Sequence, residues 1–364
     1  MAKPIERLTQ LGQSVWYDNV SRGLLQSGAI EQLIDSGVKG LTSNPTIFEK
    51  AIVQSTDYDQ DSSILVNSGL NSQEIYDSLT IKDIQQTADL LKPVYDSTNG
   101  LDGYASLEVS PHLAHDTDGT LEEARRLYEA LDRPNVMIKV PATEAGIPAM
   151  TALISEGINV NNTLIFNLEK YRDVRAGYIE GLRLRNASGD DISKVSSVAS
   201  FFVSRVDTAV DALLNKGSHS KLLGKAAIAN ASIAYRDFLE DFGTGNFDDL
   251  RGLGAQVQRP LWASTSTKNP MYPDLYYVEA LVGDNTINTM PDKTLKDFIS
   301  QGNPSNQLGN NSKEASEILN SLKSAGIDMD QVTDQLLVDG IQQFTDSFDV
   351  ALQNIQDKYA VASY

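Results

Sequence analysis

The sequence predicts an α/β fold, a single (β/α)8 (TIM) barrel over residues 1–364 with additional N-terminal and C-terminal helices. Segments typical of strands and of helices alternate about eight times along the chain, which is the order that produces a parallel sheet. A barrel of about 250 residues with insertions and a helical tail accounts for the 364-residue length. A doubly wound open sheet is the other closure, but no glycine-rich phosphate loop follows the first strand.

Short apolar and β-branched runs indicate the strands, and apolar positions three or four residues apart indicate the helices. The strands are expected at residues 14–18, 38–41, 103–109, 136–143, 158–166, 195–202, 256–264 and 286–289. The helices are expected at residues 5–13, 28–37, 57–95, 120–131, 143–157, 169–183, 205–214, 225–242 and 291–298. Residues 302–312 are rich in Asn, Gly and Ser and predict a loop, and residues 313–364 predict a helical extension packed on the barrel.

Two helix starts carry capping signals. Ser43 or Asn44 can cap a helix whose first turn holds Pro45. Residues 120–123 (TLEE) form a capping box, with a Thr followed three residues later by a Glu.

Composition and charge exclude several classes of protein. The net charge of −19 and the pI near 4.5 disfavour binding to nucleic acid or to an anionic membrane. An anionic substrate would therefore need a local cationic pocket. The chain has no cysteine, which excludes disulfides, thiolate metal sites and cysteine nucleophiles and fits a cytoplasmic enzyme. No apolar run approaches the ~20 residues of a membrane span, and the charged first 13 residues do not resemble a secretory signal.

A lysine stands inside the apolar strand at residues 136–143 (VMIKVPAT). Lysine is depleted in strands, and it is seldom buried without a reason. Side chains alternate along a strand, so Met137 and Lys139 share one face. A buried amine favours its neutral form, which is a nucleophile that forms a Schiff base with a carbonyl substrate. The alternative is a lysine near a strand end with its ammonium group in water.

In several other strands, polar residues stand at alternate positions near the carboxyl end, so they share one face of the strand. In barrels, the catalytic groups lie at these carboxyl ends. The alternating sets are Ser14, Trp16 and Asp18; Tyr104, Ser106 and Glu108; Asn159, Asn161 and Thr163; Ser196, Val198, Ser200 and Phe202; and Trp262 and Ser264. Each polar group alone is also typical of a turn or a helix cap. Together they surround a lysine with carboxylates, an amide and hydroxyls, which is what carbonyl chemistry through an imine requires.

Four motifs resemble the transaldolase family, class I aldolase-type barrel enzymes of the pentose phosphate pathway. They are residues 40–48 (GLTSNPTIF), 136–140 (VMIKV), 157–164 (GINVNNTL) and 199–205 (ASFFVSR), and the resemblance spans residues 15–298. It implies a metal-free and cofactor-free enzyme that moves a dihydroxyacetone unit through a lysine Schiff base. The implied donor is sedoheptulose 7-phosphate or fructose 6-phosphate, and the implied acceptor is glyceraldehyde 3-phosphate or erythrose 4-phosphate.

The resemblance also implies a role for each matching residue. Lys139 would form the imine, and Asp18 would act as acid and base on the C4 hydroxyl of the substrate. Glu108 and Thr163 would position the catalytic water. The remaining implied residues are Asn44 and Asn161 for the dihydroxyacetone unit, Ser200 and Ser264 beside them, Phe202 in the pocket wall, and Arg205 for the phosphate.

One position departs from the family pattern. In many relatives a second phosphate-binding Arg closely follows the seventh-strand Ser, whereas here Lys268 is the only cation in the stretch after Ser264. Lysine can serve as a point charge, without the bidentate geometry of arginine. Two alternatives remain: a fructose 6-phosphate aldolase of the same superfamily, which has a tyrosine where Phe202 stands, and a non-catalytic sugar-phosphate-binding barrel.

Two further sequence features are not assigned to the active site. His112, His115 and Asp116 could suggest a metal-dependent aldolase, but only one other histidine exists in the chain, so they are expected at the barrel rim or at a helix start. The apolar positions of the tail helices predict packing against the barrel, and the chain is expected to be a monomer or a homodimer.

Overall fold

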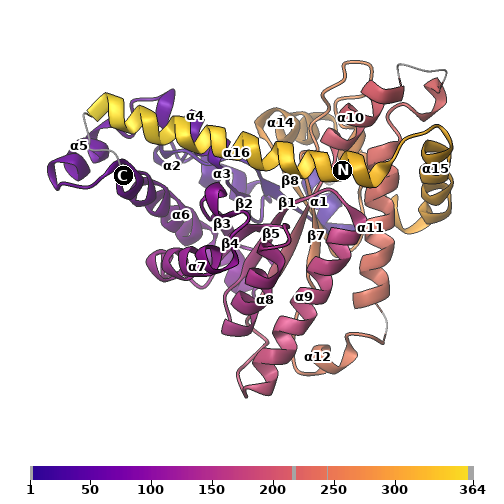
Figure 1. Cartoon of the computed structure of the whole chain (residues 1–364), viewed down its shortest axis with the longest axis horizontal. Helices are drawn as coiled ribbons and strands as arrows, with labels where there is room; N and C mark the ends of the chain where they lie inside the picture. The colour runs from indigo at the N-terminus through magenta and orange to yellow at the C-terminus, as the bar shows by residue number, and fades with distance from the viewer. Residues whose placement is uncertain (1–2, 215–218, 244, 360–364) are drawn as a thin grey trace.

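In the computed structural model, which describes residues 3–214, 219–243 and 245–359, eight parallel strands close into a barrel in chain order (Figure 1). The strands are β1 (Gln13–Tyr17), β2 (Leu41–Thr42), β3 (Ala105–Glu108), β4 (Val136–Pro141), β5 (Val160–Ile165), β6 (Ser197–Phe202), β7 (Arg259–Ala263) and β8 (Thr286–Met290). β1 pairs with both β2 and β8, so the sheet has no free edge. The predicted (β/α)8 barrel is confirmed, and the open doubly wound sheet is excluded.

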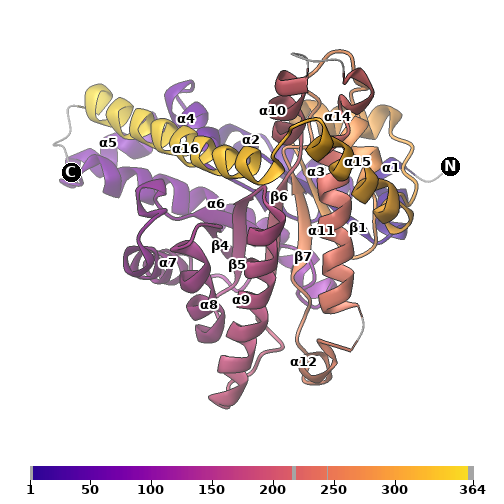
Figure 2. The same ribbon diagram turned by 45° about the vertical axis from the view of Figure 1, so that its right-hand side comes forward.

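Helices surround the barrel and extend the chain at both ends (Figures 1 and 2). Those before β5 are α1 (Pro4–Gln10), α2 (Arg22–Gln26), α3 (Ala29–Asp35), α4 (Pro45–Val53), α5 (Asp59–Asn67), α6 (Ser72–Ser97), α7 (Thr117–Leu131) and α8 (Gly146–Glu156). Those after it are α9 (Leu168–Ala187), α10 (Ser204–Leu214), α11 (Ala226–Phe242), α12 (Asp248–Gly252), α13 (Tyr276–Ala280), α14 (Asp292–Gln301), α15 (Ser312–Ser324) and α16 (Met329–Tyr359). Within the described ranges, no helix has both the length and the apolar composition of a membrane span.

The capping prediction at Asn44 is confirmed, whereas the one at residues 120–123 is wrong. Asn44 Oδ1 accepts a hydrogen bond from Ile47 N at 3.0 Å, with Pro45 at the first helical position. Helix α7 begins a turn earlier than expected, because Asp116 Oδ1 accepts from Gly119 N at 3.1 Å. Thr120 instead donates its hydroxyl to Leu113 O at 2.9 Å.

Two other boundaries shift because local hydrogen bonds take residues out of the expected elements. Val38 N donates to Leu33 O, and Gly37 has a φ of 109°, so the chain turns at the end of α3. Val38 is therefore part of this helix end, and β2 begins only at Leu41. Thr143 was expected to begin a helix, but its Oγ1 accepts from Gly146 N at 2.8 Å, and α8 begins at Gly146.

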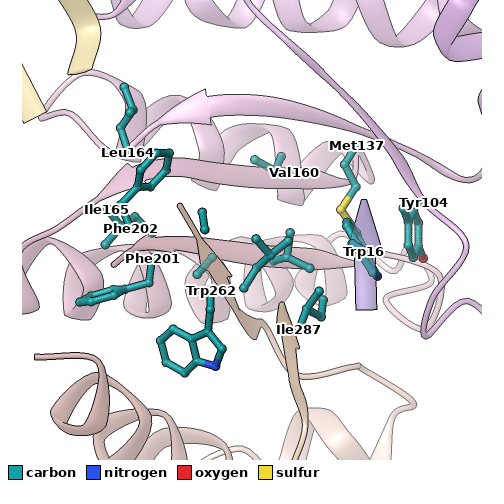
Figure 3. Packing of buried hydrophobic residues seen from close by; sticks show 14 of the residues in the cluster. Trp16, Tyr104, Met137, Val160, Leu164, Ile165, Phe201, Phe202, Trp262 and Ile287 are labelled. Carbon is teal, nitrogen blue, oxygen red and sulfur yellow. The ribbon is translucent and has the colours of Figure 1, made fainter. Parts of the chain in front are cut away.

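The interior of the barrel is filled by side chains from alternate residues of the strands. Figure 3 shows Met137 and Trp16 pointing toward each other, and the Trp16 ring centroid lies 6.4 Å from that of Tyr104. At the amino ends of the strands, Asp102 binds three lumen groups: Ser14 Oγ at 2.7 Å, Trp16 Nε1 at 3.0 Å and Arg259 Nη1 at 3.0 Å. This buried network fills the barrel interior at the amino ends of the strands, opposite the carboxyl ends where barrels place their chemistry.

The long C-terminal helix crosses that open end. In both views α16 runs above the carboxyl ends of the strands, from the side of α10 to the side of α4 and α5 (Figures 1 and 2). Its Phe344 and Phe348 are buried, and Ser347 Oγ lies 2.9 Å from Thr46 Oγ1 of α4. The tail is therefore part of the cavity wall and does more than pack on the outside of the barrel.

Candidate active site

A cavity of about 550 Å³ lies at the carboxyl ends of the strands and gathers most of the predicted site residues. Those that line it are Asp18, Asn44, Lys139, Thr163, Ser200, Phe202, Ser264, Arg205 and Lys268. Glu108 and Asn161 lie beside it, because the strand register places Glu108, Lys139 and Asn161 next to one another on β3, β4 and β5. The strand alternation therefore predicted correctly that these residues lie at or beside one cavity.

Lys139 is buried at the floor of the cavity, with 4% of its surface exposed. Its Nζ donates a hydrogen bond to Ser43 O at 2.8 Å and lies 3.2 Å from Glu108 Oε2. The second contact is an ion pair whose angle falls outside hydrogen-bond geometry. The Glu108 carboxylate is therefore close enough to accept a proton from the Lys139 amine. The two contacts also hold the Lys139 side chain in place at the cavity.

Glu108 is a carboxylate in a nearly dry position, with 5% of its side chain exposed. Burial raises the pKa of Glu108 above its ordinary value, and the nearby charge of Asp18 adds to this, while the ion pair with Lys139 opposes it. A carboxylate with a raised pKa takes up a proton more readily at neutral pH. Glu108 is therefore suited to exchange a proton with the lysine or with a water beside it.

Asp18 follows β1 directly, and its backbone N–H donates to Met290 O at 2.9 Å. Its Oδ1 accepts a hydrogen bond from Thr42 Oγ1 at 2.7 Å, and Thr42 Oγ1 lies 2.7 Å from Thr289 Oγ1. These contacts fix the carboxylate at the edge of the cavity.

The acidity of Asp18 is set by opposing effects. Burial raises the pKa of Asp18, which the Thr42 hydrogen bond and then the positive charges around the cavity oppose. The raised pKa makes Asp18 a stronger base than an ordinary aspartate, which suits a group that takes a proton from a substrate hydroxyl and returns it.

Hydroxyl and amide groups continue the site along β5 and β6. Asn161 Oδ1 accepts from Ser200 Oγ at 2.6 Å, and Asn161 Nδ2 donates to Ser106 Oγ at 3.2 Å. Thr163 Oγ1 is buried and makes no hydrogen bond to another described residue. Because Thr163 lines the cavity, this hydroxyl without a protein partner is a candidate to bind a substrate or a water there.

Ser264 reaches the cavity for a different reason from the one predicted. Trp262 was expected to share its inward parity, but the Trp262 ring packs against Phe201 (Figure 3). The Phe201 ring packs in turn on Tyr171 of α9. Arg259 instead points into the lumen, so Trp262 faces the outer helices. Ser264 has φ 55°, which ends the strand alternation and turns its side chain toward the cavity.

The outer part of the cavity carries positive charge. Arg205, in the first turn of α10, places Cζ 5.5 Å from the ring centroid of Phe202. Lys268 Nζ donates to Ser266 Oγ at 2.7 Å, so the loop after β7 brings this lysine to the cavity. Burial lowers the pKa of Arg205, and Asp18 opposes this. These cations give this part of the cavity a positive charge that suits an anionic ligand.

The sequence matches the family described as Transaldolase/Fructose-6-phosphate aldolase over residues 15–355. The chain belongs to this family. It is 44% identical over 365 residues to a transaldolase of Trichodesmium erythraeum, with 96% of both chains covered. It is 46% identical over 352 residues to one of Thiobacillus denitrificans, covering 96% of this chain and 98% of that one. A third, from Parafrankia, is 44% identical with both chains covered completely.

The predicted enzyme class, a transaldolase, is confirmed by these relatives. A solved structure of 2,3-dimethylmalate lyase overlaps with a TM-score of 0.27 at 13% identity, which bears on neither fold nor function.

Other cations near the barrel, and the histidine cluster considered from the sequence, have partners outside this site. Arg259 pairs with Asp102 at the amino ends of the strands, and Lys293 pairs with Asp274 at 3.2 Å and Asp297 at 2.7 Å. Asp116 caps α7, and His112 Nε2 lies 2.7 Å from Asp349 Oδ1 of α16 at the rim. Among the described residues, no group of three or more His, Asp or Glu side chains is placed to hold a metal ion.

Several residues of the cavity wall were not predicted. They are Thr42, Lys50, Ser266, Thr289, Asp292, Gln343 and Phe344. Thr42 and Thr289 could have been found as polar residues at the ends of short strands. Lys50, Gln343 and Phe344 stand on helices α4 and α16, whose inward faces depend on how the helices cross the barrel. No strand parity points to them.

Proposed function

We propose that the reaction proceeds through an imine on Lys139 and transfers a dihydroxyacetone unit from a ketose phosphate to an aldose phosphate. The observation that carries this is a buried lysine beside a buried glutamate, with Asp18 facing the same cavity. The cations around the outer cavity support a phosphorylated substrate, which a chain of net charge −19 would otherwise repel.

Imine formation begins when the neutral Lys139 amine attacks the C2 carbonyl of the ketose. Glu108, whose raised pKa favours its protonated form, gives a proton to the C2 alkoxide and takes the extra proton from the nitrogen, which leaves a neutral carbinolamine. The carbinolamine then loses its hydroxyl as water with the help of a proton from Glu108. The hydroxyl of Thr163 can hold that water beside the reacting carbon.

Cleavage of the carbon–carbon bond requires a base at the C4 hydroxyl. Asp18 takes that proton, C4 becomes the aldehyde of the released aldose phosphate, and the electron pair of the C3–C4 bond moves into the protonated imine. The resulting enamine stays on Lys139. When an acceptor aldose phosphate binds, the enamine carbon attacks its aldehyde, and Asp18 returns the proton to the new alkoxide.

Each remaining polar group has a place in this scheme. Asn44 and the Asn161–Ser200 pair hold the hydroxyls of the dihydroxyacetone unit, with Ser264 nearby, and Arg205 and Lys268 hold the phosphate. No cofactor is needed, because the protonated imine itself accepts the electrons. We also propose that the protein is cytoplasmic, because its sequence contains no cysteine and so needs no oxidising compartment.

Acceptor dependence separates a transferase from an aldolase that releases free dihydroxyacetone. With fructose 6-phosphate and erythrose 4-phosphate together, we expect steady formation of sedoheptulose 7-phosphate and glyceraldehyde 3-phosphate. With fructose 6-phosphate alone, we expect at most one equivalent of glyceraldehyde 3-phosphate per enzyme, since the enamine has no acceptor. Continuous release of dihydroxyacetone without an acceptor would instead favour the aldolase.

A further inference from the structure

Lys50 of α4 faces the same cavity as Arg205 and Lys268, although it belongs to a different wall. Arg205 stands on α10 after β6, and Lys268 in the loop after β7, whereas α4 follows β2. Three elements therefore bring three cations to the outer part of one cavity.

None of these three cations is neutralised by an ion pair with a carboxylate in the part of the chain that the structure describes. Lys268 Nζ donates to a hydroxyl, and the Arg205 guanidinium lies over an aromatic ring. Lys293, which also lines the cavity, differs because two carboxylates hold it. In a chain with 49 acidic and 30 basic residues, three unpaired cations around one cavity indicate a site for an anion.

The three charges lie close enough to repel one another. Partial burial lowers the pKa of Lys268, and the positive charges of Arg205 and Lys50 lower it further. A phosphate dianion between them would remove this repulsion. Lysine and arginine both bind phosphate, the first as a point charge and the second through paired N–H groups.

The charge of Lys50 acts on Asp18 less strongly than the charges of the other two cations do. The charges that act most strongly on Asp18 belong to Lys139, Arg205 and Lys268. Along α4, Lys50 comes six residues after the cap residue Asn44, which corresponds to about 9 Å of helix. Lys50 therefore stands where the end of a longer sugar chain would reach.

The first turn of α4 is held on two sides, and the helix packs along α16. Asn44 caps its first turn at the barrel, and Thr46 contacts Ser347 of α16 at 2.9 Å. Gln343 and Phe344 of α16 line the cavity on the same side. The stem of Lys50 thus starts from a held backbone, and only its flexible side chain has to adapt to a ligand.

We propose that Lys50 is a third phosphate-binding cation and that it favours the longer of the two ketose phosphates. This rests on the proposed function, which places a phosphate at Arg205 and Lys268. In a seven-carbon donor the phosphate lies one carbon farther from the imine than in a six-carbon donor. The phosphate of the seven-carbon donor then moves away from Arg205 and toward Lys50.

The test compares Lys50→Met with wild type on sedoheptulose 7-phosphate and on fructose 6-phosphate, each with a fixed acceptor. We expect kcat/KM to fall about tenfold for the seven-carbon donor and about threefold for the six-carbon donor, with kcat nearly unchanged. Lys313→Met is the matched control, because Lys313 is an exposed helix lysine of α15 away from the cavity. This control should match wild type on both donors, and equal melting temperatures confirm the fold.

A Lys50→Met enzyme that behaves like the Lys313→Met control, or that loses the same factor on both donors, would overturn the proposal. Arg205→Ala shows which part has failed. If Arg205→Ala still prefers phosphorylated over unphosphorylated acceptors as strongly as wild type, the phosphate site itself is wrong. If Arg205→Ala loses that preference while Lys50→Met leaves kcat/KM unchanged for both donors, only the role of Lys50 is wrong.

Discussion

Replacing Lys139 with methionine should reduce transfer by at least about 10⁴-fold, because no other group at the floor of the cavity can hold the substrate as an imine. Methionine is similar in length and suits a position with 4% exposure. The barrel should therefore remain folded. Transfer is measured as ketose formation in the presence of donor and acceptor, with circular dichroism to check the fold.

The same substitution should change how stability depends on pH. Without Lys139, Glu108 remains buried without its partner, and an uncompensated buried charge costs about 3–5 kcal/mol. Burial already raises the pKa of Glu108, and loss of the lysine raises it further. A carboxyl whose folded-state pKa lies above its unfolded value stabilises the fold below the unfolded pKa and loses that contribution as pH rises through the folded pKa.

At mildly acidic pH, the melting temperature of the Lys139→Met protein should therefore be near that of the wild type. As pH rises, its melting temperature should fall below the wild-type value. Adding Glu108→Gln should remove most of that pH dependence, because the amide does not titrate. Transfer activity that survives in Lys139→Met, with the fold intact, would contradict the role of this lysine.

Replacing Asp18 with asparagine should leave imine formation in place and slow carbon–carbon cleavage by about 10²–10⁴-fold. The amide has nearly the same shape, and its oxygen can still accept the hydrogen bond from Thr42. It cannot take the proton from the C4 hydroxyl. Single-turnover cleavage of a ketose phosphate measures the loss, and reductive trapping of the donor shows whether the imine still forms.

The pH profile gives an independent check on Asp18. Cleavage requires the ionised carboxylate, so the wild-type rate should fall as pH drops through the pKa of Asp18. Burial raises that pKa, so this acid limb should lie above the value of about 4 that is ordinary for an aspartate. The residual cleavage by Asp18→Asn should lack this limb, whereas Glu108→Gln should retain it. Near-normal cleavage by Asp18→Asn would remove Asp18 from the mechanism.

The barrel and the floor of the site could be predicted from the sequence because both follow from short-range periodicity. Alternating strand and helix signals determine the parallel order, and strand parity turns Asp18, Glu108 and Lys139 toward one cavity. These residues lie within or directly after regular strands, so a local rule was sufficient. The register of neighbouring strands then brings Glu108 beside Lys139.

The rule failed where the backbone leaves the regular strand. The left-handed conformation of Ser264 reverses the side-chain direction after Trp262, and such a φ cannot be inferred for a serine from local pattern. The capping box at residues 120–123 was outcompeted by Asp116, one turn earlier. Both errors concern local geometry that tertiary packing decides.

The upper wall of the cavity could not be predicted because it depends on contacts far apart in the sequence. Gln343 and Phe344 reach the site only because α16 crosses the barrel and packs on α4. Lys50 stands on α4, whose position also depends on the packing against α16. An amphipathic pattern predicts that a helix packs against something, but it does not tell which neighbour it meets.

Borohydride reduction in the presence of a ketose phosphate tests the central claim most directly. An imine on Lys139 would be reduced to a stable secondary amine, which peptide mapping by mass spectrometry locates. We expect the three-carbon adduct on the peptide that contains residues 136–141, and none when the donor or the borohydride is omitted. An active enzyme that forms no adduct, or one whose adduct lies on a different lysine, would contradict the mechanism.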